Sequence, residues 1–310
     1  MSRALGLVLG YAADQLFGDP RRFHPVAGFG VVASALERQL VSTRSFAPLT
    51  SRLDRRTAGI AYTGVLVGGA AAMGGRFDGT VPTALATYAV LGGRSLAREA
   101  TAVHDHLQRG DLDAAREQVT HLVGRNPSQL GPDDIARATV ESVAENTSDA
   151  VVAPLFWGAV AGPAGLLGYR AANTLDAMVG HRTPRHEQFG WASARFDDAL
   201  NLAPARLAAA LAAAAGGNPR DAVNAWRRDA PQHPSPNAGP VEASFAGSLG
   251  LQLGGTNVYA GGVEDRGHLG HGKPPTVADI PRANRLAARV GWAALGVSVL
   301  LASRPRRQPS

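Results

Sequence analysis

Long uncharged runs alternate along this chain with segments that carry arginine. Residues 57–75, 79–93 and 150–169 contain no Asp, Glu, Lys or Arg, and charged residues bound each run on both sides. The first and third runs approach the length of about 20 residues that a helix needs to cross a bilayer. Further apolar segments, shorter or interrupted, lie at residues 5–17, 202–217 and 286–303. The alternation favours a helical bundle in a membrane, although each shorter segment would equally suit a buried helix of a soluble protein.

The charged residues narrow the range of partners. The 310 residues carry a formal net charge of +6, nearly all of it from arginine, because Lys273 is the one lysine in the sequence. The arginines are not interleaved with aromatic residues, which argues against nucleic acid as a partner. They fit the cytoplasmic loops of a membrane protein, and they also fit a site for phosphorylated substrates. The sequence has no cysteine, which excludes disulfides, thiolate zinc sites and thiol nucleophiles.

The distribution of arginine and glycine predicts the topology. Arginine is concentrated in residues 52–56, 94–137 and 304–307, and the positive-inside rule places those segments in the cytoplasm. Residues 57–93 would then be an out-and-back pair of spans. The Gly162-Pro163 step would interrupt a helix over residues 150–169, and we favour a helix that breaks and returns over one that crosses.

The remaining pattern is helical. Residues 95–122 have helical periodicity around Gly110-Asp111, which predicts a helical hairpin with its turn there, and the glycine-dense residues 247–272 predict loops. No strand alternation is sustained long enough to imply a sheet. Residues 1–310 are therefore predicted to form one membrane-embedded domain, an all-α polytopic bundle with cytoplasmic helical loops.

An acid-rich amphipathic stretch, residues 135–157, runs without a break into apolar sequence. On a helix, Arg137, Glu141 and Glu145 fall on one side, and Val140 and Ala144 fall on the other. The charged side could hold a cation or phosphates. It could equally be a solvated surface face, because charge stripes usually face water.

A charged turn follows the first apolar block. Asp14, Asp19 and His24 lie in a short segment punctuated by glycine and proline. The segment is either part of a site or a helix-ending turn in which Gly18 takes the left-handed conformation. The local pattern does not separate the two.

Two predicted helices farther along present carboxylate and amide groups. The first carries Arg170, Asn173 and Asp176 on one face, and the second carries Asp197, Asp198 and Asn201. Such oxygens are the ligands that Mg²⁺ prefers, and Mg²⁺ usually keeps substrate phosphates in its shell. Arg185 lies in the loop between the helices, where it would meet polyphosphate or simply face solvent.

The last polar set lies in glycine-rich sequence near the C-terminus. Asn237, Glu242 and Ser244 precede the lone Lys273. No strand and helix flank the glycines as a P-loop or a dinucleotide fingerprint requires, so neither motif is predicted.

Four blocks of sequence, in this order, resemble the CobD/CbiB family, the adenosylcobinamide-phosphate synthases of cobalamin biosynthesis. The blocks are DQLFGDPRRFHPV, then RATVESVAENTSDAVVAPLFW, then YRAANTLDAMVGH with FGWASARFDD and PARL, and finally SPNAG with the LGG that follows. The resemblance covers most of the chain. It implies a multi-pass enzyme of the cell membrane that joins adenosylcobyric acid to (R)-1-amino-2-propanol or its O-phosphate by an amide bond, with ATP and Mg²⁺, in a cytoplasmic active site. An acyl phosphate would be the intermediate.

The resemblance carries the family's motif positions onto Asp14, Asp19, His24, Glu141, Glu145, Asn146, Asp149, Asn173, Asp176, Arg195, Asp197 and Asp198. The individual roles of these residues are our own inference. We expect the catalytic residues to be Glu141, Glu145, His24 and Arg195. We expect the magnesium ligands to come from Glu141, Glu145, Asp149, Asp176, Asp197 and Asp198. We expect substrate and nucleotide to be bound by Asp14, Asp19, Asn146, Arg170, Asn173, Arg185, Asn237 and Lys273. One departure concerns residue 126, where family members commonly have Asp and this chain has Asn126, a weaker magnesium ligand.

Two other classes of function stay open, together with the state of assembly. One is a membrane prenyl transferase, which also uses acidic and asparagine clusters with Mg²⁺. The other is a non-catalytic membrane sensor or transport accessory of related fold. For the enzyme, the resemblance fits either a homo-oligomer or an association with other enzymes of cobalamin assembly.

Overall fold

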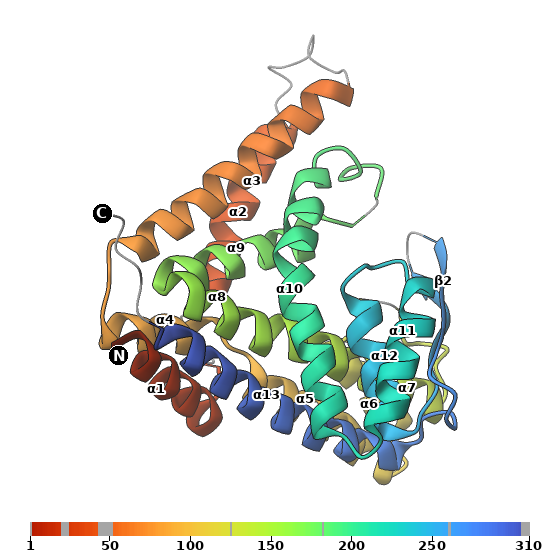
Figure 1. Cartoon of the computed structure of the whole chain (residues 1–310). Helices are drawn as coiled ribbons and strands as arrows, with labels where there is room; N and C mark the ends of the chain where they lie inside the picture. The colour runs from red at the N-terminus through yellow and green to blue at the C-terminus, as the bar shows by residue number, and fades with distance from the viewer. Residues whose placement is uncertain are drawn as a thin grey trace. The chain divides into compact units, whose positions relative to one another are not determined.

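The computed structural model describes residues 2–19, 25–42, 52–124, 126–181, 183–259 and 262–304, so His24 lies outside the described residues. These residues are mostly helical, as predicted (Figure 1). The helices are α1 (Ser2–Phe17), α2 (Pro25–Ser42), α3 (Arg52–Gly75), α4 (Thr80–Val90), α5 (Gly93–Gln108), α6 (Leu112–Val119), α7 (Pro132–Thr147), α8 (Ala153–Ala161), α9 (Pro163–Val179), α10 (Trp191–Ala215), α11 (Pro219–Asp229), α12 (Ala238–Leu249) and α13 (Ile280–Ala302).

The chain divides into two compact units that alternate along the sequence. Unit 1 consists of Met1–Leu91, Pro154–Leu200 and Leu295–Ser310, and unit 2 consists of Gly92–Ala153 and Asn201–Ala294. Unit 1 therefore holds α1 to α4, α8 and α9. Unit 2 holds α5 to α7, α11 and α12, and the helices α10 and α13 each contribute residues to both units.

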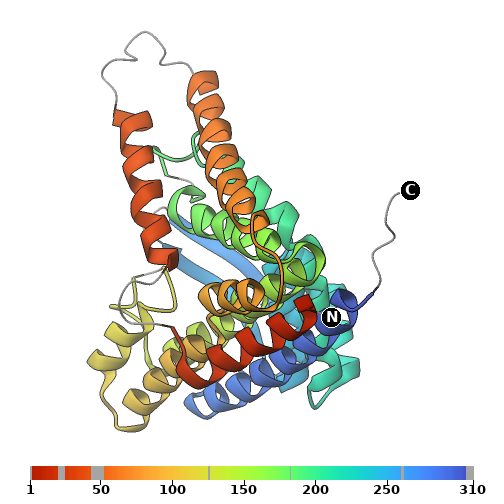
Figure 2. The ribbon, with the colours of Figure 1, turned by 90° about the vertical axis from the view of Figure 1, so that its left-hand side faces the viewer.

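In unit 1 the main helix pairs are α1 with α4 and α3 with α9. Helices α2 and α3 run in opposite directions (Figure 2). The core includes Tyr62 of α3, Leu175 of α9 and Phe189, whose ring centroid lies 5.0 Å from that of Tyr62. Small residues let α1 and α4 approach closely: a Cβ atom added to Gly10 would lie 2.4 Å from the Cβ of Thr87.

Residues 57–93 were predicted to form two membrane spans, and the prediction is wrong for the second of them, which corresponds to α4. Helix α4 has 11 residues, about 17 Å of helix, which is too short for a hydrocarbon core of about 30 Å. It packs against α1, whereas α3 packs against α9, so α3 and α4 are not the two arms of one hairpin. Two helical segments of the described chain are long and apolar enough to cross a membrane, Arg55–Gly75 and Val277–Ala302.

The predicted break at Gly162-Pro163 is confirmed. Helix α8 ends at Ala161, Gly162 has a φ of +64°, and α9 begins at Pro163. A left-handed glycine followed by proline stops one helix and starts the next, since proline has no N–H to donate and its φ suits a first helical turn.

Exposed apolar side chains are concentrated in unit 1. Among the described residues, every large apolar side chain that is exposed belongs to unit 1, except Leu202 and Trp292. Val31 of α2 and Val65 of α3 are examples, exposed to 69% and 66%. Only 28% of the apolar window in Arg55–Gly75 is buried by the rest of the chain. Apolar surface of this extent marks a membrane or protein contact.

Unit 2 contains the predicted helical hairpin and an element that was not predicted. Helices α5 and α6 are joined by a turn at Gly110, whose φ is +72°, as expected. Residues 247–272 were predicted to be loops, but β1 (Leu253–Tyr259) and β2 (Gly262–Leu269) pair there as an antiparallel hairpin with an irregularity at Gly254 to Thr256. It packs against α11 and α12 (Figure 1). The prediction failed because glycine interrupts the alternation that marks a strand.

Candidate functional site

Helix α7 carries the acidic stretch of residues 135–157. It begins at Pro132 after Gly131, and it continues through a π-helical turn, Ser148–Val152, into α8. Such π turns occur often at functional sites, because the extra residue changes the direction of the side chains that follow. Both faces of α7 are largely buried, so the solvated acidic face that the pattern allowed is not what the structure has.

Glu141 and Glu145 lie one turn apart on α7 but in different surroundings. Glu141 is buried, and its Oε1 accepts hydrogen bonds from the backbone N–H of Gly254, at 2.9 Å, and from Nη1 of Arg137, at 3.2 Å. The same Arg137 nitrogen donates to the carbonyl oxygen of Gly254 at 2.6 Å. Glu141 and Arg137 thus join α7 to the base of the β-hairpin.

Glu145, Asn146 and Asp149 follow at the end of α7, and all three are partly exposed. The Nδ2 of Asn146 donates to the carbonyl oxygen of Ser142 at 3.0 Å. Two carboxylates four residues apart, together with a neighbouring amide, are oxygen donors of the kind that Mg²⁺ prefers.

No group of three or more His, Asp or Glu side chains that could hold a metal occurs in the part of the chain that the structure describes. A Mg²⁺ ion bound with substrate phosphates commonly takes one or two carboxylates from the protein. The donor set at the end of α7 is of that size.

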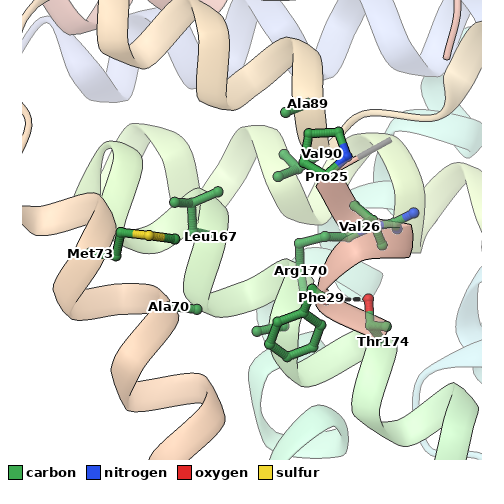
Figure 3. A pocket seen from close by; sticks show the side chains of 11 residues that line it. Pro25, Val26, Phe29, Ala70, Met73, Ala89, Val90, Leu167, Arg170 and Thr174 are labelled. Carbon is green, nitrogen blue, oxygen red and sulfur yellow. Dashed lines mark hydrogen bonds between the residues drawn. The ribbon is translucent and has the colours of Figure 1, made fainter. Parts of the chain in front are cut away.

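In unit 1, helix α9 presents the predicted set Arg170, Asn173 and Asp176. Nη1 of Arg170 donates to Oδ1 of Asn173 at 3.4 Å. The helix ends at Gly180, whose N–H donates to the carbonyl oxygen of Asp176 at 2.7 Å. Arg170 lines a mainly apolar pocket that opens to the outside (Figure 3).

Arg185, predicted to bind phosphate, is held in an ion pair. Its Nη2 lies 2.8 Å from Oε1 of Glu37 on α2, and Nε2 of His186 lies 3.0 Å from the same oxygen. Glu37 is buried, whereas the Arg185 side chain is 53% exposed. These contacts anchor the loop before α10 to α2.

The two acidic residues on α10 differ in solvent exposure. Asp197 is buried, and Asp198 lies 3.7 Å from Nη1 of Arg195. Burial raises the pKa of Asp198, an effect that the charge of Arg195 partly offsets.

The N-terminal turn has the geometry of a helix end. Gly18 has a φ of +63° and donates its N–H to the carbonyl oxygen of Asp14 at 2.8 Å. The buried Asp14 carboxylate accepts a hydrogen bond from Nε2 of Gln15. Asp19, which follows Gly18, is half-buried. The helix-ending turn is therefore present, whether or not the carboxylates also serve a site.

The predicted binding residues near the C-terminus have partners within unit 2. Oδ1 of Asn237 accepts a hydrogen bond from Nη1 of Arg206 at 2.8 Å. Nζ of Lys273 lies 3.5 Å from Oδ2 of Asp279, and the Lys273 side chain is largely exposed.

A buried charged cluster in unit 2 was missed by sequence reasoning. Every residue of α12 is buried, and within it Oε1 of Glu242 lies 3.6 Å from Nε2 of His233 and 3.5 Å from Nη1 of Arg266 on β2. Nδ1 of His233 lies 3.0 Å from the backbone nitrogen of Ser235, which donates its N–H to the ring. Burial and the charge of Arg266 lower the pKa of His233 to about 4. Glu242 was noted in the sequence, but its partners lie on separate elements with no local spacing to reveal them.

Comparison with known proteins gives one family. The model of the CobD/CbiB protein family matches residues 7–287 of the chain. The cobalamin biosynthesis protein CobD of Mycobacterium tuberculosis (strain ATCC 25618 / H37Rv) is 48% identical over 98% of this chain and 97% of its own length. Proteins of the same name from Chromobacterium violaceum and Geobacter metallireducens are each 44% identical, over 94% and 80% of this chain and the same shares of their own lengths. No solved structure matches the chain.

Proposed function

Because this chain belongs to the CobD/CbiB family, we propose that it is an enzyme of cobalamin biosynthesis that joins adenosylcobyric acid to (R)-1-amino-2-propanol, or to its O-phosphate, with consumption of ATP. The observation that carries the proposal is the extent of the match: nearly the whole chain is covered by the family model, and relatives named for cobalamin biosynthesis align over almost their full length.

The proposed chemistry overcomes the inertness of a carboxylate toward an amine. The corrinoid carboxylate attacks the γ-phosphorus of ATP, which forms an acyl phosphate and releases ADP. The amine then attacks the acyl carbon, the carbon–oxygen bond to phosphate breaks, and inorganic phosphate leaves with one oxygen of the original carboxylate. The attacking nitrogen loses a proton to a base, for which His24 is our candidate.

Glu145 and Asp149, with the amide oxygen of Asn146, are the residues that we propose to hold Mg²⁺ beside the nucleotide. When bound, this ion supplies positive charge next to the phosphate oxygens. Glu141 acts differently, since its bonds to Gly254 and Arg137 make it a positioning residue that fixes α7 against the hairpin. In unit 1, Arg195 is our candidate for neutralising charge on a substrate oxygen.

We propose that the cell membrane is where this enzyme works, with unit 1 in contact with lipid. The support is the concentration of exposed apolar side chains in unit 1 and the two helical segments that are long and apolar enough to span a bilayer. Water would meet that surface at a cost of roughly 25 cal/mol for each Å² of apolar area.

The test measures ATP consumption by the purified full-length chain with adenosylcobyric acid and Mg²⁺, with and without the amine. We expect ADP release that depends on both the corrinoid and the amine. A prenyl transferase would release pyrophosphate from a prenyl donor without ATP, and a sensor or accessory protein would release neither. Either of those two results would refute the proposal.

A further inference from the structure

The pocket that Arg170 lines in unit 1 combines apolar walls with a single guanidinium group. Its walls come from α2, α3, α4 and α9, and Figure 3 shows Met73 and Leu167 on one side of it and Val26 and Phe29 on the other. Thr174 also lines it, but its hydroxyl already donates to the carbonyl oxygen of Arg170 at 2.7 Å. The enclosed part of the pocket is only about 100 Å³ and the pocket opens to the outside, so it suits one part of a larger molecule, such as a segment of a chain, and not a whole cofactor.

The guanidinium group is incompletely satisfied by the protein. Nη1 of Arg170 has a long contact of 3.4 Å to Asn173, and no described residue accepts a hydrogen bond from its buried Nε. A buried charged donor without an acceptor is unfavourable, so this nitrogen calls for an acceptor supplied from outside the chain. A guanidinium fork suits the oxygens of a phosphate or a carboxylate.

The apolar lining of the pocket restricts the kind of molecule that can carry the anion. A nucleotide presents ribose, base and several phosphates, and each would lose hydrogen bonds to water against Phe29, Met73 and Leu167. An alkyl chain loses none. The pocket is also continuous with apolar surface, because Met73, which lines it, is itself 53% exposed.

We propose that this pocket binds an anionic phospholipid, with the lipid phosphate on Arg170 and an acyl chain along Phe29, Met73 and Leu167. The inference rests on the proposed contact of unit 1 with lipid, and it is independent of the ligation reaction. From the sequence we expected Arg170 to bind an anionic group of a substrate or nucleotide. In this proposal Arg170 also binds an anionic group, but that group is the phosphate of a lipid. Arg170 then distinguishes anionic from zwitterionic lipids, and the apolar walls distinguish a lipid from a soluble phosphate.

The test is native mass spectrometry of the purified, delipidated full-length chain with phosphatidylglycerol or phosphatidylcholine of the same acyl chains. We expect phosphatidylglycerol to occupy one site about tenfold more tightly, because the choline ammonium of phosphatidylcholine neutralises its head group and is repelled by the guanidinium of Arg170. Arg170→Gln should abolish this preference, and Arg170→Lys should keep most of it because the charge remains.

A second pair of variants tests the apolar walls. Ala70 lines the pocket on α3, so Ala70→Phe should displace the acyl chain and reduce binding of both lipids at this site. Ala61→Phe is the control on the same helix, since Ala61 is exposed and does not line the pocket. Thermal melting of each variant confirms that it is folded.

Three results would overturn the proposal. The first is an unchanged lipid preference in folded Arg170→Gln. The second is equal loss of lipid from Ala70→Phe and Ala61→Phe, which would indicate general coating of the apolar surface. The third is displacement of phosphatidylglycerol by millimolar ATP or inorganic phosphate in a manner that requires Arg170. None of these results depends on amide formation, so failure here is distinguishable from failure of the proposed reaction.

Discussion

Glu141 and Glu145 illustrate how two identical residues on one helix acquire different surroundings. The family resemblance and their spacing together predicted both as magnesium ligands, which was sufficient to identify the acidic block. It was not sufficient to separate them, because the groups that occupy Oε1 of Glu141, Gly254 and Arg137, include a backbone N–H more than one hundred residues away in the chain. Glu145 is partly exposed at the π-helical turn.

Replacing Glu145 with Gln should lower the rate of amide formation by about 100-fold, equivalent to about 3 kcal/mol of lost stabilisation of the transition state, while stability changes little. The measurement is the turnover rate of corrinoid amide at saturating Mg²⁺ATP. Asp133→Asn, the same change at an exposed position of α7, is the matched control and should remain near wild type. A Glu145→Gln rate equal to that of the control would remove Glu145 from the mechanism.

Replacing Glu141 with Ala should mainly reduce the stability of the fold. The half-buried Arg137 and the N–H of Gly254 would each lose an acceptor, so we expect the free energy of unfolding to fall by about 2–4 kcal/mol. Denaturant titration of the detergent-solubilised chain measures this. Stability equal to that of the wild type would show that the Glu141 contacts do not hold the hairpin to α7.

His233 predicts a dependence of stability on pH. Its folded-state pKa of about 4 lies below the ordinary value of 6.5, because the ring is buried and faces Arg266. Between about pH 6.5 and pH 4, His233 binds a proton in the unfolded chain but not in the folded chain. The contribution of His233 to stability therefore falls as the pH falls, by on the order of 3 kcal/mol. His233→Gln should flatten that part of the curve of unfolding free energy against pH. Identical slopes for the two proteins would contradict a neutral, buried His233.

At the scale of elements, the turns were predictable and the pairings were not. Gly110 and Gly162-Pro163 fixed helix ends because few residues adopt a positive φ and proline cannot continue a helix. The hairpin β1–β2 was missed, since its stability comes from packing on α11 and α12 and not from local alternation. The partner of α4 was also missed, because hydropathy reports length and polarity but not which helix lies alongside.

The close approach of α1 and α4 gives a prediction at this scale. Gly10→Ala should destabilise the chain by about 1–3 kcal/mol, since the new Cβ would lie 2.4 Å from the Cβ of Thr87 and the helices must separate. Gly28→Ala on α2 is the control: its Cβ would meet nothing within 4 Å, so the better helix propensity of alanine should leave stability unchanged or raise it. Thermal melting in detergent compares them, and equal melting temperatures would show that this contact is not tight.

At the scale of the whole molecule, the two units differ in how much apolar surface they expose. The mean hydropathy of the chain is near neutral, but unit 1 exposes many large apolar side chains and unit 2 exposes few of them. We therefore expect the full chain to remain in the membrane pellet after washing with alkaline carbonate and to be released by detergent. Recovery in the carbonate supernatant would contradict contact of unit 1 with lipid.

The most direct test of the central claim uses adenosylcobyric acid labelled with oxygen-18 in its free carboxylate, together with MgATP, (R)-1-amino-2-propanol and the purified chain. Mass spectrometry of the same reaction should show the corrinoid as its amide, with one labelled oxygen lost from the carboxylate and found in inorganic phosphate. Corrinoid recovered unchanged in the presence of every substrate would contradict the account.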